Sequence, residues 1–166
     1  MIDSKGKFME GFLQRYRFRM VIPYIKGDIM DFGGNEGELK KFVKGKYLCV
    51  NYDNSVMDNK TFDTIVSLAV IEHIEFNEVF SIFKKFKEKH LRKGGKIFLT
   101  TPTKMAKPIL EFMAWLGILD KENIAEHKHY WSKEDIYILA EKTGFKVEKY
   151  KKFQSGVNQL AVFGHK

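Results

Sequence analysis

The sequence predicts an α/β protein with a doubly wound, mostly parallel sheet and an antiparallel final strand. Three observations support this fold class. Short apolar stretches of strand length alternate along the chain with longer stretches of helical spacing. A glycine-rich turn directly follows the first of these strands, as it does where a backbone approaches a nucleotide-like ligand. Two final strand-like stretches are joined by Ser155 and Gly156, which predicts a closing pair of strands.

The composition indicates one domain over residues 1–166. A chain of 166 residues with 44% apolar content can bury one core and is too short for two ordinary domains. The lone Cys49 excludes a disulfide framework and fits a reducing compartment. No signal-peptide pattern is present, and the longest apolar runs are far shorter than a membrane span. The expected localisation is therefore cytoplasmic.

The positive charge bears on the choice of partner. A formal net charge of +8 permits an anionic partner such as nucleic acid, an acidic substrate or a membrane surface. Three arginines, Arg15, Arg17 and Arg19, alternate with aromatic residues, a pattern that on a strand resembles a nucleic-acid face. On a helix they point in different directions, which argues against nucleic-acid contact and leaves peripheral membrane contact open.

An N-terminal helix is predicted within residues 1–25. Over residues 8–24 the apolar side chains Phe8, Phe12, Leu13 and Tyr16 fall on one stripe. We expect this helix to cover the sheet edge or the ligand pocket.

The glycine turn favours a cationic ligand over a dinucleotide. A dinucleotide fingerprint needs glycine at the first, third and sixth positions, and counting from Gly33 this chain has Asn35 and Glu38 at the latter two. Asp31, Glu36 and Glu38 would also surround a pyrophosphate with negative charge. S-adenosylmethionine carries an ammonium and a sulfonium and no phosphate, so this turn suits it electrostatically.

The same turn resembles the first motif of class I methyltransferases, Asp-x-Gly-x-Gly-x-Gly. Asp31, Gly33 and Gly37 match, and Asn35 stands in place of the middle glycine. Asparagine is the non-glycine residue that best tolerates a positive φ, so we expect the turn to persist. The resemblance implies a Rossmann-like methyltransferase fold with S-adenosylmethionine as cofactor. The implied cofactor contacts in the turn are Asp31, Gly33, Gly34, Asn35 and Gly37.

Two later motifs extend the resemblance. Residues 62–74, with Glu72 and His73, resemble the fourth-strand motif of small-molecule methyltransferases related to quinone and sterol methylating enzymes. Residues 91–95 resemble the family's Leu-x-Pro-Gly-Gly turn, with Lys93 in place of proline. Three motifs in order make the resemblance more specific than any one of them, and it covers nearly the whole chain from Ile29 onward.

The resemblance also implies cofactor contacts at two strand ends. In this family an acid after the second strand holds the ribose, and here the candidates are Asn51 and Asp53. We favour Asp53 because a carboxylate can accept from two hydroxyls at once. Leu68 and Ala69, which follow the strand that begins at residue 62, are the other implied cofactor contacts.

One helix-strand unit is predicted to be missing after the second strand. Only residues 54–61 separate Asp53 from the next strand, and a helical crossover between parallel strands needs a dozen residues or more. In full-length relatives the missing unit helps to enclose the adenine.

Residues 103–131 fall outside the core pattern and are expected to form a substrate lid. The alternative is that the helix expected over residues 108–119 only covers the sheet. His127 and His129 follow this helix without a third ligand, so no metal site is predicted. An imidazole titrates near neutral pH, and the candidate bases are Glu72, His73, His127 and His129, with a purely structural role as the alternative for His73.

These features together predict an S-adenosylmethionine-dependent methyltransferase that acts on an unidentified small molecule, lipid or glycan. Methyl transfer is a displacement at a sulfonium carbon, so the protein mainly has to align the nucleophile. The alternative is a degenerate methyltransferase domain that serves as a binding or scaffold module, which the lost crossover and Asn35 favour. The sequence leaves the acceptor and the oligomeric state open.

Overall fold

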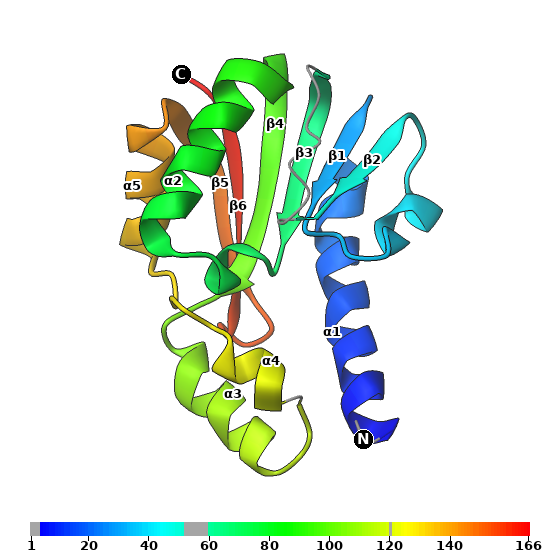
Figure 1. The fold of residues 1–166 in the computed structure, drawn as a ribbon, viewed down its shortest axis with the longest axis vertical. Coiled ribbons are helices and arrows are strands. Elements are labelled where there is room, and N and C mark those ends of the chain that lie inside the picture. The colour runs from blue at the N-terminus through cyan, green and yellow to red at the C-terminus, as the bar shows by residue number, and fades with distance from the viewer. Residues whose placement is uncertain (1–3, 52–59, 120) are drawn as a thin grey trace.

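A six-stranded sheet forms the centre of the molecule (Figure 1). The computed structural model describes residues 4–51, 60–119 and 121–166. The strand order is β2-β1-β3-β4-β6-β5; the first four strands are parallel, and β6 runs antiparallel to both β4 and β5. The predicted fold class, a mostly parallel doubly wound sheet with an antiparallel final strand, is confirmed. The strands are β1 (Ile29–Phe32), β2 (Tyr47–Val50), β3 (Phe62–Leu68), β4 (Leu91–Pro102), β5 (Phe145–Phe153) and β6 (Asn158–His165).

Helices cover both faces of the sheet. Helices α2 and α5 pack on one face and α1 on the other, as the two main buried clusters show. None of the helices in the described part of the chain is long and apolar enough to cross a bilayer. The α-helices are α1 (Ser4–Val21), α2 (Phe76–Lys85), α3 (Ala106–Trp115), α4 (Lys121–Ala125) and α5 (Lys133–Lys142). Short helical segments are η1 (Ile22–Tyr24), η2 (Glu38–Phe42), η3 (Ile71–His73) and the π-helical η4 (Phe86–His90).

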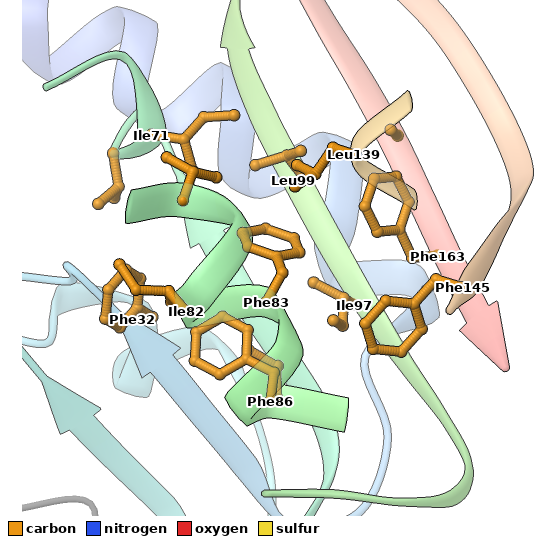
Figure 2. Close-up of a cluster of buried hydrophobic side chains, with 14 of the residues drawn as sticks. Phe32, Ile71, Ile82, Phe83, Phe86, Ile97, Leu99, Leu139, Phe145 and Phe163 are labelled. Atoms are coloured by element: carbon orange, nitrogen blue, oxygen red, sulfur yellow. The ribbon is translucent and has the colours of Figure 1, made fainter. Parts of the chain in front are cut away.

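The larger core lies between the sheet and helices α2 and α5 (Figure 2). Phe83 and Phe86 project from the α2 region and are fully buried. They meet Ile97 of β4 and Phe163 of β6, which face the same side of the sheet. Burying aromatic side chains of this size is the main driving force that fixes α2 on the sheet, and α2 in turn positions the turn that precedes it.

Helix α1 packs differently from the sequence prediction. Phe12, on the expected apolar stripe, is 55% exposed, whereas Phe18 and Val21 are buried against the sheet. The reason is visible in Figure 1, where the C-terminal part of α1 lies along the sheet and its N-terminal part extends beyond it. The predicted stripe was therefore wrong in its buried positions, although Leu13 and Tyr16 do make contacts, Leu13 with a small cluster around α3 and Tyr16 stacked on Phe153.

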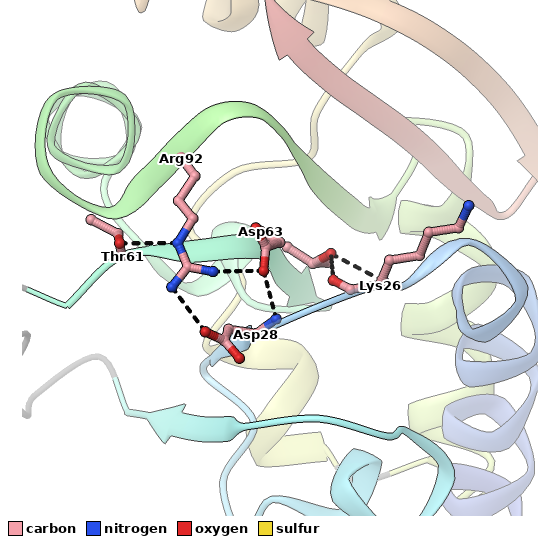
Figure 3. Close-up of polar contacts among 6 residues, drawn as sticks. Lys26, Asp28, Thr61, Asp63 and Arg92 are labelled. Atoms are coloured by element: carbon pink, nitrogen blue, oxygen red, sulfur yellow. Dashed lines mark hydrogen bonds and ion pairs between the residues drawn. The ribbon is translucent and has the colours of Figure 1, made fainter.

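A polar cluster ties together three parallel strands at the edge opposite their carboxyl ends (Figure 3). The Arg92 guanidinium contacts Asp28 at 2.8 Å and Asp63 at 2.7 Å, and it donates to Thr61 Oγ1 at 3.1 Å. The backbone N–H of Asp28 donates to the Asp63 carboxylate at 2.8 Å. These bonds fix the register of β1, β3 and β4, so the carboxyl ends of β1 and β3 are held in place relative to each other.

The sheet order creates a switch point beside β1. From β1 the chain moves to β2 on one side and then returns to β3 on the other. In α/β sheets ligands bind outside the carboxyl ends of strands at such a point. The predicted loss of a helix-strand unit rests on residues 54–61, of which 54–59 lie outside the described residues. Within the described part of the chain, β2 is the edge strand. The short 3-10 helix η2 follows the glycine turn and begins after Gly37, which lies in the left-handed region.

Candidate cofactor and acceptor site

A cavity of about 750 Å³ opens at the carboxyl ends of β1 and β3. Its walls come from seven parts of the chain: α1, the glycine turn, the end of β3 with η3, the end of β4, helix α3, the segment around α4, and the turn between β5 and β6. Its size lies within the usual range for small-molecule sites. Six of the nine implied cofactor contacts line this cavity: Asp31, Gly33, Gly34, Asn35, Leu68 and Ala69.

The glycine turn has the backbone conformation that its sequence predicts. Gly33 has a φ of +78° and Asn35 a φ of +49°, so the asparagine adopts the positive φ expected of it. A Cβ atom added to Gly33 would lie 2.5 Å from Cγ2 of Val70, a distance that real side chains do not reach. The Gly33 N–H donates to the Val50 carbonyl at 2.7 Å, which anchors the turn to β2. Glycine is therefore required at position 33, because the backbone has a positive φ and because a side chain would collide with Val70.

Asp31 is a buried carboxylate behind this turn. Its side chain is only 4% exposed, and it accepts a hydrogen bond from the Tyr47 hydroxyl of β2. Burial raises the pKa of Asp31 to about 6, and the Tyr47 hydrogen bond opposes part of that shift. Any side chain at Gly34 would run into the Asp31 carboxylate, so this position also needs glycine. No local sequence pattern reveals the contact of Tyr47 with Asp31, because it depends on the pairing register of β1 with β2.

The end of β3 leads into the cavity through a strained residue. Ala69 has a φ of +58°, which is unusual for a residue with a side chain, and its N–H donates to the Thr100 carbonyl at 2.9 Å. Backbone strain of this kind persists only where surrounding structure enforces it, and it concentrates at functional sites. The strained turn directs the chain from β3 into η3, which carries Glu72 and His73.

Glu72 is a buried carboxylate at the far wall of the cavity. Its side chain is 1% exposed and accepts a hydrogen bond from Thr101 Oγ1 at 2.9 Å. Burial raises the pKa of Glu72 to about 7. Its backbone carbonyl accepts from the N–H groups of Lys128 at 2.8 Å and His129 at 3.2 Å, which ties the segment after α4 to η3.

These hydrogen bonds to the Glu72 carbonyl bring His127 close to His73. The His73 and His127 rings lie 4.7 Å apart at an angle of 77°, and both line the cavity. Burial lowers the pKa of both rings, that of His127 to about 4 with a further contribution from His73. Both imidazoles are therefore neutral at pH 7. The Nδ1 atom of His127 is buried and has no hydrogen-bond partner in the described part of the chain.

Three of the predicted site residues do not lie in the cavity wall, and a fourth cannot be placed. His129 packs its ring against Phe76 and Trp131 and approaches Asp135 at 3.4 Å, so the structure gives no support to it as a base. Gly37 and Asn51 are not among the residues that line the cavity, and Gly37 is the left-handed residue that precedes η2. Asp53 lies outside the described residues.

The structure adds cavity residues that carried no recognisable sequence signal. Arg17 of α1 lines the cavity, as do Gln154, Val157 and Asn158 of the turn between β5 and β6. Arg17 is one of three arginines that alternate with aromatic residues, and this alternation gives no indication that one of them lines a cavity. The turn between β5 and β6 follows a strand pattern and contains no motif.

The segment 103–131 contributes several residues to the cavity wall. Ile109, Leu110 and Met113 of α3 line the cavity with apolar surface. Phe112 and Trp115, on the same helix, are 59% and 70% exposed and are not among the cavity-lining residues. Helix α3 is thus apolar both on the side that lines the cavity and on its exposed side.

Comparison with known proteins identifies the class. A family described as "Methyltransferase domain" matches residues 7–150. The chain therefore belongs to the methyltransferase domain family, as its three motifs predicted. A search of curated proteins finds no match.

Solved structures show the same fold at low sequence identity. The mitomycin 7-O-methyltransferase MmcR has a TM-score of 0.68 and 12% identity, over 93% of this chain and 54% of that one. The protein PH0226 from Pyrococcus horikoshii has a TM-score of 0.66 and 18% identity, over 93% of this chain and 92% of that one. A methyltransferase from Bacteroides fragilis, solved with S-adenosyl-L-homocysteine, has a TM-score of 0.63 and 16% identity, over 90% and 76%. This chain spans about half the length of MmcR. The Rossmann-like fold of S-adenosylmethionine-dependent methyltransferases is confirmed.

Proposed function

We propose that this protein is an S-adenosylmethionine-dependent methyltransferase that acts on a small molecule with an apolar body. The observation that carries the proposal is one continuous cavity, with a glycine turn and a buried carboxylate at one end and neutral histidines with apolar side chains at the other. Family membership and the Bacteroides fragilis structure with S-adenosyl-L-homocysteine support the choice of cofactor.

The cofactor occupies the end of the cavity formed by the glycine turn. Asp31 lies behind this turn, and Glu36 and Glu38 line the wall beside it, so the local charge is negative. A ligand that carries an ammonium and a sulfonium is favoured at such a place, whereas a pyrophosphate is repelled. Gly33 and Gly34 have no side chains between the backbone and the ligand, which permits a close approach.

The ribose contact is proposed at the end of β2. The Oδ1 atom of Asn51 is buried and has no hydrogen-bond partner among the described residues, so it can accept from a hydroxyl. Asp53 remains the candidate favoured by the sequence, and it lies outside the described residues.

The acceptor occupies the end beneath α3. Ile109, Leu110 and Met113 supply apolar surface, and His73 and His127 supply neutral ring nitrogens. In the transfer an acceptor oxygen or nitrogen bonds to the methyl carbon while the carbon–sulfur bond breaks, and its electron pair stays on sulfur. If the acceptor atom carries a proton, a neutral imidazole takes it, because only an unprotonated ring can act as a base.

Cofactor binding is expected to strengthen as the pH rises from 5 to 7. The pKa of Asp31 is raised to about 6, so its carboxyl is mostly protonated at pH 5 and mostly ionised at pH 7. A ligand ammonium pairs with the ionised form, so binding should release a proton near pH 6. Calorimetric titration with S-adenosyl-L-homocysteine, in two buffers of different ionisation enthalpy, measures both effects.

The matched variant for this prediction is Asp31→Asn, which keeps an oxygen for the Tyr47 hydroxyl. It should bind more weakly and lose the dependence between pH 5 and 7. Since ionising a buried carboxylate disfavours the folded state, the variant should be at least as stable as the parent at pH 7. A parent protein whose affinity does not change over this pH range would show that Asp31 does not face the ligand charge.

The activity itself is tested by label transfer. The protein is incubated with S-adenosylmethionine labelled on the methyl group and with fractions of a small-molecule extract from cells. The proposal expects label in an apolar low-molecular-weight fraction, and none in added RNA. Cofactor binding without label in any fraction would favour the alternative of a binding or scaffold module.

A further inference from the structure

Three metal-ligating side chains meet at the acceptor end of the cavity. Glu72, His73 and His127 each offer one ligand atom, and these atoms all lie within 4.8 Å of one another. The first two are neighbours in η3, and the third comes from the segment after α4. The sequence predicted no metal site because His127 and His129 lack a third ligand, and the fold supplies Glu72 and His73 in place of His129.

We propose that Glu72, His73 and His127 form a binding site for a divalent transition-metal ion of the zinc type. Two imidazoles and one carboxylate are the donor set of catalytic zinc sites that keep a further position open. Imidazole nitrogen also selects zinc, cobalt and nickel over magnesium, which prefers oxygen ligands and water.

One nitrogen of the cluster lacks a partner in the described part of the chain. The buried Nδ1 of His127 has no hydrogen-bond partner among the described residues, which is unfavourable in the absence of a ligand. A metal ion bound within the cluster would give this ring a partner.

The surroundings hold two of the ligands in place. Thr101 Oγ1 donates to one oxygen of the Glu72 carboxylate at 2.9 Å, an outer contact of the kind that orients ligating carboxylates. The Lys128 N–H, directly after His127, donates to the Glu72 carbonyl at 2.8 Å. Metal–ligand bonds of about 2.0 to 2.2 Å require the three atoms to approach more closely than 4.8 Å, so the side chains must move inward on binding. Glu126 and Arg17 act electrostatically on His73 in opposite directions.

A metal ion here would have a role in acceptor binding, and this part of the inference rests on the proposed function. Three protein ligands leave at least one coordination position open, and all three residues line the cavity. An acceptor hydroxyl bound at that position would lose its proton to solvent more readily, and the resulting alkoxide would attack the methyl carbon. With both imidazoles bound to the metal ion, this would replace proton transfer to a neutral histidine. The acceptor class is then a molecule that carries a hydroxyl on an apolar body.

The test is titration of the protein, freed of metal with a chelator and without cofactor, with Zn²⁺, Co²⁺ and Mg²⁺. We expect one Zn²⁺ per chain by calorimetry, visible absorption bands of a low-coordinate Co²⁺ site, and no comparable binding of Mg²⁺. His127→Gln should weaken Zn²⁺ binding by roughly 100-fold, since even loss of an outer partner costs about 10- to 100-fold. His129→Gln is the matched control, two positions along the same segment and outside the cluster, and should bind Zn²⁺ as the parent does.

Two results would overturn the metal site: no stoichiometric Zn²⁺ binding, or equal losses in His127→Gln and His129→Gln, which would indicate nonspecific binding to surface histidines. Circular dichroism of both variants shows whether they are folded. The titration contains no cofactor, so it is independent of the proposed function. Zn²⁺ binding in a protein that does not bind S-adenosyl-L-homocysteine would support the metal site and reject the function.

Discussion

Gly33→Val is expected to weaken binding of S-adenosyl-L-homocysteine by about 100-fold or more, which corresponds to about 2.7 kcal/mol. Gly33 has a φ of +78°, a conformation that a β-branched residue adopts only under strain. Its Cβ would also lie 2.5 Å from Val70 Cγ2, so the turn must shift away from the position that admits the ligand. Calorimetric titration with S-adenosyl-L-homocysteine measures the loss.

Gly94→Val is the matched control for this change. Gly94 has a φ of +83°, almost the same as Gly33, but no atom lies within 4 Å of its added Cβ and it is not in the cavity wall. Both variants carry backbone strain of about 1 to 3 kcal/mol, so both should unfold at lower temperature. Only Gly33→Val should lose the ligand. If both bind as the parent does, the glycine turn is not the cofactor site.

Trp131→Ala is expected to lower the free energy of unfolding by about 3 to 5 kcal/mol. Trp131 is fully buried, stacks on Phe76 with ring centroids 5.1 Å apart, and donates from Nε1 to the Ile71 carbonyl at 3.4 Å. The variant leaves a cavity beside η3, so the positions of Glu72 and His73 should also be disturbed. For a chain of this size the melting temperature should fall on the order of 10 °C.

Trp115→Ala provides the comparison, because the chain has two tryptophans in opposite environments. Trp115 is 70% exposed on α3, so its removal should change the free energy of unfolding by no more than about 0.5 kcal/mol. Thermal and urea unfolding of both variants give the two values. Similar losses would show that α3 is packed differently from the arrangement described above.

The local part of the site could be predicted from sequence, and the part assembled from distant segments could not. Asp31, Gly33 and Asn35 belong to one short motif whose conformation depends on the residues themselves, so their place in the cavity follows from strand, turn and spacing. The partner of Asp31 could not be found in this way, because Tyr47 reaches it only through the register of two parallel strands.

The two histidines after α4 show the same limit. The local sequence does not distinguish His127 from His129, and both are predicted as candidate bases. The choice between them is made by packing: the His129 ring lies against Trp131, and the bonds from this segment to the Glu72 carbonyl place His127 toward the cavity. Those contacts join segments far apart in the chain, so no local pattern encodes them.

Thermal unfolding with increasing S-adenosyl-L-homocysteine tests the central claim, that the cavity at the glycine turn binds this cofactor. At a ligand concentration of one hundred times the dissociation constant, binding adds about 2.7 kcal/mol to the free energy of unfolding. For a chain of this length the expected rise in melting temperature is about 5 to 11 °C, and Gly33→Val should show almost none of it. A parent protein whose melting temperature does not change at millimolar ligand would contradict the claim.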